Sequence, residues 1–320
     1  MTIKILNGDC RDVLKTLPDQ SVHTCVTSPP YFGLRDYGHT GQMGLEPTPD
    51  EFVSELVNVF REVRRVLRDD GTLWLNIGDS YASYRDGKAT PDTTLGLSEG
   101  TLVPKGSAKN RMSSTFVGTS IKHKDLIGIP WRVAFALQAD GWFLRQDIIW
   151  HKPNPMPESV IDRCTKAHEY IFLLSKSPKY YFDHEAIKEP VAASSIIRLT
   201  QPNISAQVGS NRVPFKTNGT MKAVGNTEMR NKRSVWTVTT KPFKGAHFAT
   251  FPPDLIEPCV LAGCPVDGVV LDPFGGAGTT GLVASNNNRN TILIELNEEY
   301  VNLSIDRIGL DATPLPTNGA

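Results

Sequence analysis

A glycine-rich turn between a buried strand and a helix constrains this sequence most. An apolar run, residues 268–271, leads directly into Asp272-Pro273-Phe274-Gly275-Gly276-Ala277-Gly278-Thr279-Thr280-Gly281. Glycines let the backbone approach a ligand closely, and the N-terminus of the following helix offers free N–H groups to a negative group. The helix and a second strand, residues 291–295, complete a strand–loop–helix–strand unit ending in Glu295. The segment therefore predicts a cofactor site in an α/β fold.

The sequence of this turn has to be compared with the motifs of several cofactor sites. The spacing of Gly276, Gly278 and Gly281 matches the dinucleotide fingerprint, with Glu295 at about the distance of a ribose-binding acid. The absence of a lysine from the turn disfavours a phosphate-binding P-loop. Asp272 at the strand tip would repel a pyrophosphate, but suits the amino group and sulfonium of S-adenosylmethionine. We therefore expect S-adenosyl-L-methionine, with a nicotinamide or flavin cofactor and a purely structural turn as alternatives.

A second motif, Ser28-Pro29-Pro30-Tyr31, ends the apolar run of residues 21–27. Consecutive prolines end a strand and make its tip rigid. The exocyclic amino nitrogen of a base is a poor nucleophile, because its lone pair is delocalised into the ring. A side-chain acceptor and a backbone carbonyl can hold its two N–H groups out of plane, while Tyr31 offers a face to a base flipped out of the duplex. Taken alone, the motif also fits a proline turn with a packed tyrosine.

The two motifs in this order resemble the amino-methyltransferases of DNA in the β arrangement, where the catalytic motif precedes the cofactor motif. The resemblance covers nearly the whole chain and is weakest in residues 80–124 and 183–233. It implies a Rossmann-like α/β fold with a mostly parallel sheet, one antiparallel strand, flanking helices, a circular permutation and a small target-recognition insertion. It also implies that Ser28, Pro29, Pro30 and Tyr31 form the catalytic motif.

The resemblance implies further roles, position by position. Residues 272–278 would hold the methionine part of the cofactor, Glu295 its ribose and Asp9 the region of its adenine. Asp9 also fits a simple helix cap. Residues 149–154 resemble the lining of the base pocket, although Trp150 also fits a core residue. The expected cofactor-binding residues are Asp9, Phe251, Asp272, Pro273, Phe274, Gly275, Gly276, Gly278, Thr279, Thr280 and Glu295.

Positive charge is concentrated in one part of a chain whose formal net charge is zero. Residues 184–247 hold ten Lys or Arg and three Asp or Glu, hence about +7. One basic segment on a neutral chain suits a DNA-facing surface, and by position it resembles the target-recognition region. A solvated loop is the alternative. The expected DNA-binding residues are Trp150, Lys152, Arg198, Arg212, Lys216, Arg230, Lys232 and Arg233.

The pattern along the chain predicts four parts. Residues 1–183 form the catalytic half of the methyltransferase domain, with a long loop at 80–124. Residues 184–244 form the recognition insertion, 245–310 the cofactor-binding half, and 311–320 a flexible tail. The expected strands are 3–6, 21–27, 72–77, 143–150, 168–175, 268–271 and 291–295. The expected helices are 9–17, one from a capping box at Thr48 to a stop at Gly71, one from Pro130 to about Asp140, one from Pro252 to Gly263, and one after the glycine-rich turn.

Serine at the first motif position resembles the N4-cytosine enzymes, whereas the N6-adenine enzymes usually carry aspartate there. We therefore expect methyl transfer to N4 of cytosine in double-stranded DNA by base flipping and direct in-line transfer, with N6 of adenine as the alternative. A nicotinamide-dependent oxidoreductase would leave Ser28 to Tyr31 unexplained, and a non-catalytic DNA-binding module would ignore S-adenosylmethionine. RNA as a substrate stays open. Pro258-Cys259 lies in a helix rather than at a strand tip, which disfavours C5-cytosine chemistry.

Other classes of protein are disfavoured. The five cysteines are scattered, as expected for free thiols in a reducing cytoplasm, and no Cys or His pair suggests a metal site. His168-Glu169 is expected to be a structural pair, since no second histidine follows four residues later. The apolar runs are too short to cross a membrane, and no secretion signal opens the chain. We expect a cytoplasmic enzyme that acts on double-stranded DNA. A cognate restriction endonuclease as partner, a phage enzyme and an orphan enzyme all stay open, as do monomer and homodimer.

Overall fold

The computed structural model describes residues 2–34, 39, 41–82, 120–192, 196, 228–240, 251–309 and 315–316. The chain divides into two compact units, one made of Met1–Tyr181 with Ser234–Ala320 and the other of Phe182–Arg233. The expected insertion, 184–244, therefore extends past the observed boundary. Val235–Thr237 forms strand β8, which pairs with β4 of the first unit.

Within the described residues, the first unit is built on a nine-stranded sheet with the order β11-β1-β10-β9-β2-β3-β5-β4-β8. Neighbouring strands are parallel except at β5, which runs antiparallel to both β3 and β4. The predicted mostly parallel sheet with one antiparallel strand is confirmed. The strands are β1 (Ile3–Asn7), β2 (Val22–Thr27), β3 (Leu67–Ile77), β4 (Phe143–His151), β5 (His168–Ser175), β8 (Val235–Thr237), β9 (Val269–Asp272), β10 (Asn290–Glu295) and β11 (Leu315–Pro316).

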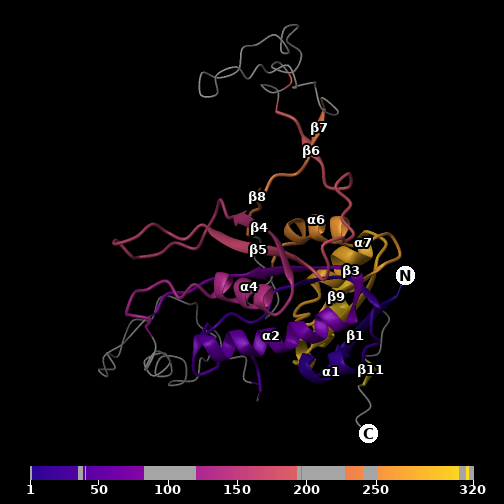
Figure 1. The fold of residues 1–320 in the computed structure, drawn as a ribbon, viewed down its shortest axis with the longest axis horizontal. Helices are drawn as coiled ribbons and strands as arrows, with labels where there is room; N and C mark the ends of the chain where they lie inside the picture. The colour runs from indigo at the N-terminus through magenta and orange to yellow at the C-terminus, as the bar shows by residue number, and fades with distance from the viewer. Residues whose placement is uncertain are drawn as a thin grey trace. The chain divides into compact units, whose positions relative to one another are not determined.

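Helices cover both faces of this sheet, with α1, α2 and α4 on one side and α6 and α7 on the other (Figure 1). Leu6 packs against the core beneath the first three helices, whereas its neighbour Ile5 packs with Leu293 and with Val301 of α8. Successive strand residues point to opposite faces, so one strand supplies both layers. None of the helices described is long and apolar enough to cross a membrane. The helices are α1 (Cys10–Thr16), α2 (Pro49–Val66), α4 (Ile129–Ala139), α6 (Pro253–Gly263), α7 (Thr279–Asn286) and α8 (Glu298–Ile308).

Helix α2 begins as predicted but ends earlier. The Thr48 hydroxyl accepts a hydrogen bond from the Glu51 N–H at 3.2 Å, and the Glu51 carboxylate accepts one from the Thr48 N–H at 3.2 Å, which completes the capping box. The helix ends at Val66, and the C-cap residue Leu67 is already extended and pairs with Val22 of β2. The predicted stop at Gly71 is therefore wrong, because Gly71 lies inside β3.

The C-terminal elements were absent from the sequence prediction. Helix α8 begins at the N-cap Asn297, whose side chain accepts from the Glu299 N–H, and ends at Gly309 with φ 72°. Two residues of the expected flexible tail, Leu315 and Pro316, pair with β1 as the edge strand β11. The flexibility of the tail stays a prediction.

The topology brings the ends of several strands to one edge of the sheet. Thr27 ends β2, Asp272 ends β9 and Glu295 ends β10, and these strands are parallel. Since β5 runs in the opposite direction, its first residues lie at the same edge, where Glu169 pairs with Trp150 near the end of β4. In open α/β sheets this edge is where ligands bind.

Candidate active site

One buried carboxylate joins the two sequence motifs. Asp272 accepts a hydrogen bond from the Thr27 hydroxyl at 2.6 Å and another from the Thr280 hydroxyl at 2.6 Å. Thr27 directly precedes Ser28, and Thr280 lies in the first turn of α7. The Ser28-Pro29-Pro30-Tyr31 motif and the glycine-rich turn therefore lie side by side, although 245 residues separate Thr27 from Asp272.

Asp272 lies in a buried position. The residue is only 1% exposed, and its carboxylate also accepts the Phe274 N–H at 3.0 Å. The carboxylate thus accepts three hydrogen bonds from within the protein, and these stabilise the turn. A direct contact of Asp272 with the amino group and sulfonium of a cofactor stays a prediction.

The burial of Asp272 predicts a pH dependence of stability. Burial raises the pKa of Asp272 to about 6 from its ordinary value of 3.8. Between these values the folded chain keeps a proton that the unfolded chain has lost, so stability falls as pH rises. Relative to Asp272→Asn, which cannot titrate, the wild-type free energy of unfolding should fall by about 2 kcal/mol from pH 4.5 to pH 7. Denaturant titrations of both proteins would measure this, and a difference independent of pH would contradict it.

Glu295 supports the glycine-rich turn from the next strand. Its carboxylate accepts the Gly276 N–H at 2.7 Å through one oxygen and the Asn297 N–H at 2.8 Å through the other. Burial raises the pKa of Glu295 despite these two hydrogen bonds. Each carboxylate oxygen has a second lone pair, so the two oxygens can still accept hydrogen bonds from a vicinal diol. These acceptor oxygens thus fit the ribose hydroxyls of S-adenosylmethionine.

Helix α8 holds the turn from the other side, through residues that the sequence did not single out. The Ser304 hydroxyl donates to the Gly276 carbonyl at 2.8 Å, and the Arg307 guanidinium donates to the Ala277 carbonyl at 3.0 Å. Gly278 adopts φ +73°, and a Cβ there would lie 2.9 Å from the Cβ of Ser304. Only glycine allows this close approach, so Gly278 is what lets α8 pack directly against the turn.

Tyr31 lies at the same sheet edge, against β3 and β5. Its hydroxyl donates to Glu169 Oε2 at 2.7 Å and lies 3.4 Å from Asn76 Oδ1. Its ring covers Gly78 so closely that a Cβ on Gly78 would lie 2.5 Å from Tyr31 Cε2. The ring therefore has a defined orientation, fixed at its tip by hydrogen bonds and along its edge by contact.

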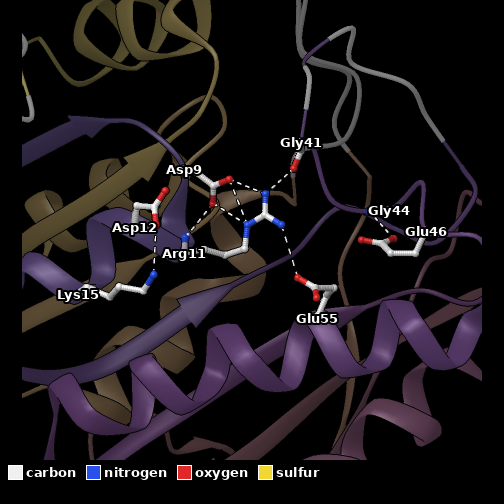
Figure 2. A network of polar contacts seen from close by, with 8 residues as sticks. All are labelled: Asp9, Arg11, Asp12, Lys15, Gly41, Gly44, Glu46 and Glu55. Atoms are coloured by element: carbon white, nitrogen blue, oxygen red, sulfur yellow. Dashed lines mark hydrogen bonds and ion pairs between the residues drawn. The ribbon is translucent and has the colours of Figure 1, made fainter. Parts of the chain in front are cut away.

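Asp9 caps α1 and is held by Arg11 (Figure 2). Its carboxylate accepts the Arg11 N–H at 2.9 Å and pairs with the Arg11 guanidinium at 2.5 Å. Burial alone would raise the pKa of Asp9, but the hydrogen bonds from Arg11 outweigh it and lower the pKa. Arg11 also donates to the Gly41 carbonyl at 2.7 Å and lies 3.5 Å from Glu55. The capping interpretation is thus observed, and a role at the adenine stays a prediction.

The residues expected to line the base pocket have partners of their own. Trp150 is 4% exposed, and its indole N–H donates to the Val238 carbonyl at 2.8 Å, as expected for a core residue, so its contact with DNA stays a prediction. The Lys152 ammonium pairs with Glu169 and lies 4.2 Å from the centre of the Trp150 ring. Phe251 is buried just before α6, while the expected segment 247–250 lies outside the described residues.

The second unit holds part of the predicted DNA-binding set. In the strands β6 (Glu189–Pro190) and β7 (Met229–Arg230), Glu189 pairs with Arg230 at 2.9 Å. Arg233 pairs with the same carboxylate at 2.7 Å. Lys232 is also described, and a DNA contact by these residues stays a prediction. Arg198, Arg212 and Lys216 lie outside the described residues.

Several known proteins resemble this chain in sequence or in structure. The DNA methylase family of the N6 and N4 type matches residues 22–306. The Type II methyltransferase M.XycI of Xanthomonas campestris pv. cyanopsidis is 47% identical over 95% of this chain and 87% of its own. The solved PvuII DNA methyltransferase (cytosine-N4-specific) aligns with a TM-score of 0.60 at 19% identity, covering 100% of this chain and 89% of that one. A putative DNA modification methylase of Thermus thermophilus, TTHA0409, solved in complex with S-adenosyl-L-methionine, aligns with a TM-score of 0.56 at 22% identity, covering 96% and 95%. This chain belongs to the N6/N4 DNA methylase family.

Proposed function

We propose that this protein is a Type II DNA methyltransferase that transfers the methyl group of S-adenosyl-L-methionine to N4 of cytosine in double-stranded DNA. One observation carries the proposal: the Asp272 carboxylate binds both Thr27, next to Ser28, and Thr280, at the start of α7. A catalytic motif and a cofactor turn joined in this way form one reaction centre. The 47% identity to a Type II methyltransferase supports the same class.

S-adenosylmethionine, when bound, supplies an electrophilic methyl group. The chain would hold the ribose at Glu295, whose two oxygens stand at the edge of the glycine-rich turn. Ser28 and a backbone carbonyl of the motif would accept the two amino N–H groups of a flipped cytosine. Holding both N–H groups in this way would localise the nitrogen lone pair, which makes the amino nitrogen a better nucleophile for the methyl group that the cofactor would supply. Tyr31 would stack on the base.

The choice of cytosine rests on Ser28, because serine at this position resembles the N4-cytosine enzymes. The enzyme would act beside a cognate restriction endonuclease, as the Type II designation of its relative suggests. Recognition of the DNA sequence would fall to Phe182–Arg233, the separate unit in which Arg230 and Arg233 flank Glu189.

The direct test combines labelled S-adenosylmethionine, mixed-sequence duplex DNA and mass spectrometry of the digested nucleosides. N4-methylcytosine is the expected product. N6-methyladenine would keep the class of enzyme and contradict the base. DNA binding that ignores S-adenosylmethionine, or hydride transfer with a nicotinamide, would contradict the class itself.

Gly78→Ala is expected to lower methyl transfer about tenfold, since small displacements in a reaction centre are costly. The added Cβ would meet Tyr31 Cε2 at 2.5 Å and push the ring from its position. Steady-state transfer rates and thermal unfolding of the same protein would measure the effect. Gly128→Ala is the control, because a Cβ there meets nothing within 4 Å although its φ of +80° makes the change mildly destabilising. Equal rates for the wild-type protein and Gly78→Ala would contradict the role given to the Tyr31 ring.

A further inference from the structure

We infer that Glu169 is a positioning residue for the target base, holding Tyr31 and Lys152 in place from the start of the antiparallel strand β5. The inference rests on the proposed function, because it assigns the two held side chains to the base pocket. The sequence alone suggested only a structural His168-Glu169 pair. The structure instead connects this carboxylate to the catalytic motif.

Glu169 receives hydrogen bonds from three different strands or strand ends. Tyr31, which follows β2, donates its hydroxyl to Glu169 Oε2 at 2.7 Å. Lys152, which follows β4, pairs with Glu169 Oε1. Asn76 of β3 donates its amide to Glu169 Oε2 at 3.4 Å and to the Tyr170 carbonyl at 3.1 Å. A single carboxylate therefore ties the tyrosine to neighbouring strands of the sheet.

Glu169 and Lys152 lie in surroundings where neither can easily find another partner. The side chains of Glu169 and Lys152 are 15% and 18% exposed, so water can replace their lost partners only in part. The Lys152 ammonium is also fixed 4.2 Å above the Trp150 ring, whose own N–H is held by the Val238 carbonyl. An ammonium held between a carboxylate and an indole is positioned, rather than free to reach a DNA phosphate.

This arrangement has a chemical consequence for a flipped base. The hydroxyl of Tyr31 donates to Glu169, so the ring is anchored at its far end, three residues after Ser28. Removing the anchor would leave the ring held only by its contact with Gly78 and by the longer contact with Asn76, so its orientation would be less well defined. The methyl-transfer step would then slow, while the glycine-rich turn would keep its shape, because Glu295 of β10 and Ser304 of α8 hold it at Gly276.

Glu169→Gln tests the inference with almost no change in volume. Tyr31 and Lys152 both donate, but a glutamine amide has one acceptor oxygen and one donor group. Lys152 can only donate and would keep the one acceptor oxygen, so the Tyr31 hydroxyl would lose its charged acceptor and could at most accept a hydrogen bond from the amide NH2 group. The expected result is a fall of about tenfold in kcat, the size of one hydrogen bond to a charged group, with KM for S-adenosylmethionine unchanged. In a Tyr31→Phe background, where one donor is already gone, the same substitution should cost at most about a third as much, because the two residues are coupled.

Glu62→Ala is the matched control, because it removes a half-buried glutamate that pairs with Arg65 on α2. It should leave kcat unchanged. An unchanged kcat in Glu169→Gln, or an equal cost in both tyrosine backgrounds, overturns the inference. Thermal unfolding of every variant verifies that the proteins compared are folded.

A measurement that needs no activity separates the two proposals. With tyrosines labelled by ¹³C at Cζ, the resonance that disappears in Tyr31→Phe should shift in Glu169→Gln and stay in place in Glu62→Ala. A resonance that does not move overturns the inference whatever the activity. If the wild-type protein transfers no methyl group at all, the proposed function fails and the positioning role with it, even where the shift shows that the contact exists.

Discussion

Ser28→Ala is expected to lower methyl transfer to DNA by at least about 100-fold, the cost of removing one acceptor that acts on the reacting group. Ser28 directly follows Thr27 at the end of β2, and the prolines after it make the tip rigid. Its hydroxyl would accept one N–H of the exocyclic amino group and so localise the nitrogen lone pair. Single-turnover rates with labelled S-adenosylmethionine would measure the loss.

The same variant should bind S-adenosylmethionine as tightly as the wild-type protein, because Ser28 does not contribute to the glycine-rich turn. Calorimetry would measure the dissociation constant. Ser21→Ala is the matched control, since the Ser21 hydroxyl donates to the Pro18 carbonyl in an exposed turn at the other end of β2. Full turnover by Ser28→Ala would remove Ser28 from the mechanism.

Glu295→Ala is expected to weaken S-adenosylmethionine binding by about 3 kcal/mol or more, roughly 100-fold in the dissociation constant. Three losses combine in this variant. The ribose would lose a charged acceptor, and the Gly276 N–H, now at 2.7 Å from the carboxylate, would lose its partner inside the turn. The N–H of Asn297, the N-cap residue of α8, would lose its partner as well.

Glu298→Ala is the control for this prediction, because it removes an equal charge from an exposed position three residues along the chain. Calorimetric titration of both variants would separate the local effect from the change in net charge. A dissociation constant for Glu295→Ala within about twofold of the wild-type value would contradict the ribose site. Such a factor corresponds to about 0.4 kcal/mol, far below a charged hydrogen bond.

The elements with strong local signals could be predicted from the sequence. The capping box of Thr48 and Glu51 and the apolar stripe of α2 follow from neighbouring residues, and so does the run from β9 through the glycine-rich turn to β10. The family resemblance predicted one antiparallel strand but did not identify it as β5. Strand β8 gave little signal, because only one of its three residues is buried.

The contacts that define the site could not be predicted in the same way, because they join distant parts of the chain. Asp272 meets Thr27 across 245 residues, and Tyr31 meets Glu169 across 138. The sequence indicated which side chains stand at the sheet edge, but not which of them pair. The burial of Asp272 was therefore not predicted, and Glu169 was overlooked because its role depends on the direction of β5.

The central claim is that this chain methylates cytosine N4 at specific sites in duplex DNA. The most direct test expresses the chain in a bacterial host without its own DNA methylation and maps every modified base in the genome by single-molecule sequencing. The Ser28→Ala variant serves as the control and should leave the DNA unmodified. We predict N4-methylcytosine at one recurring sequence. A genome without modified bases, or one modified only at adenine N6, would contradict the claim.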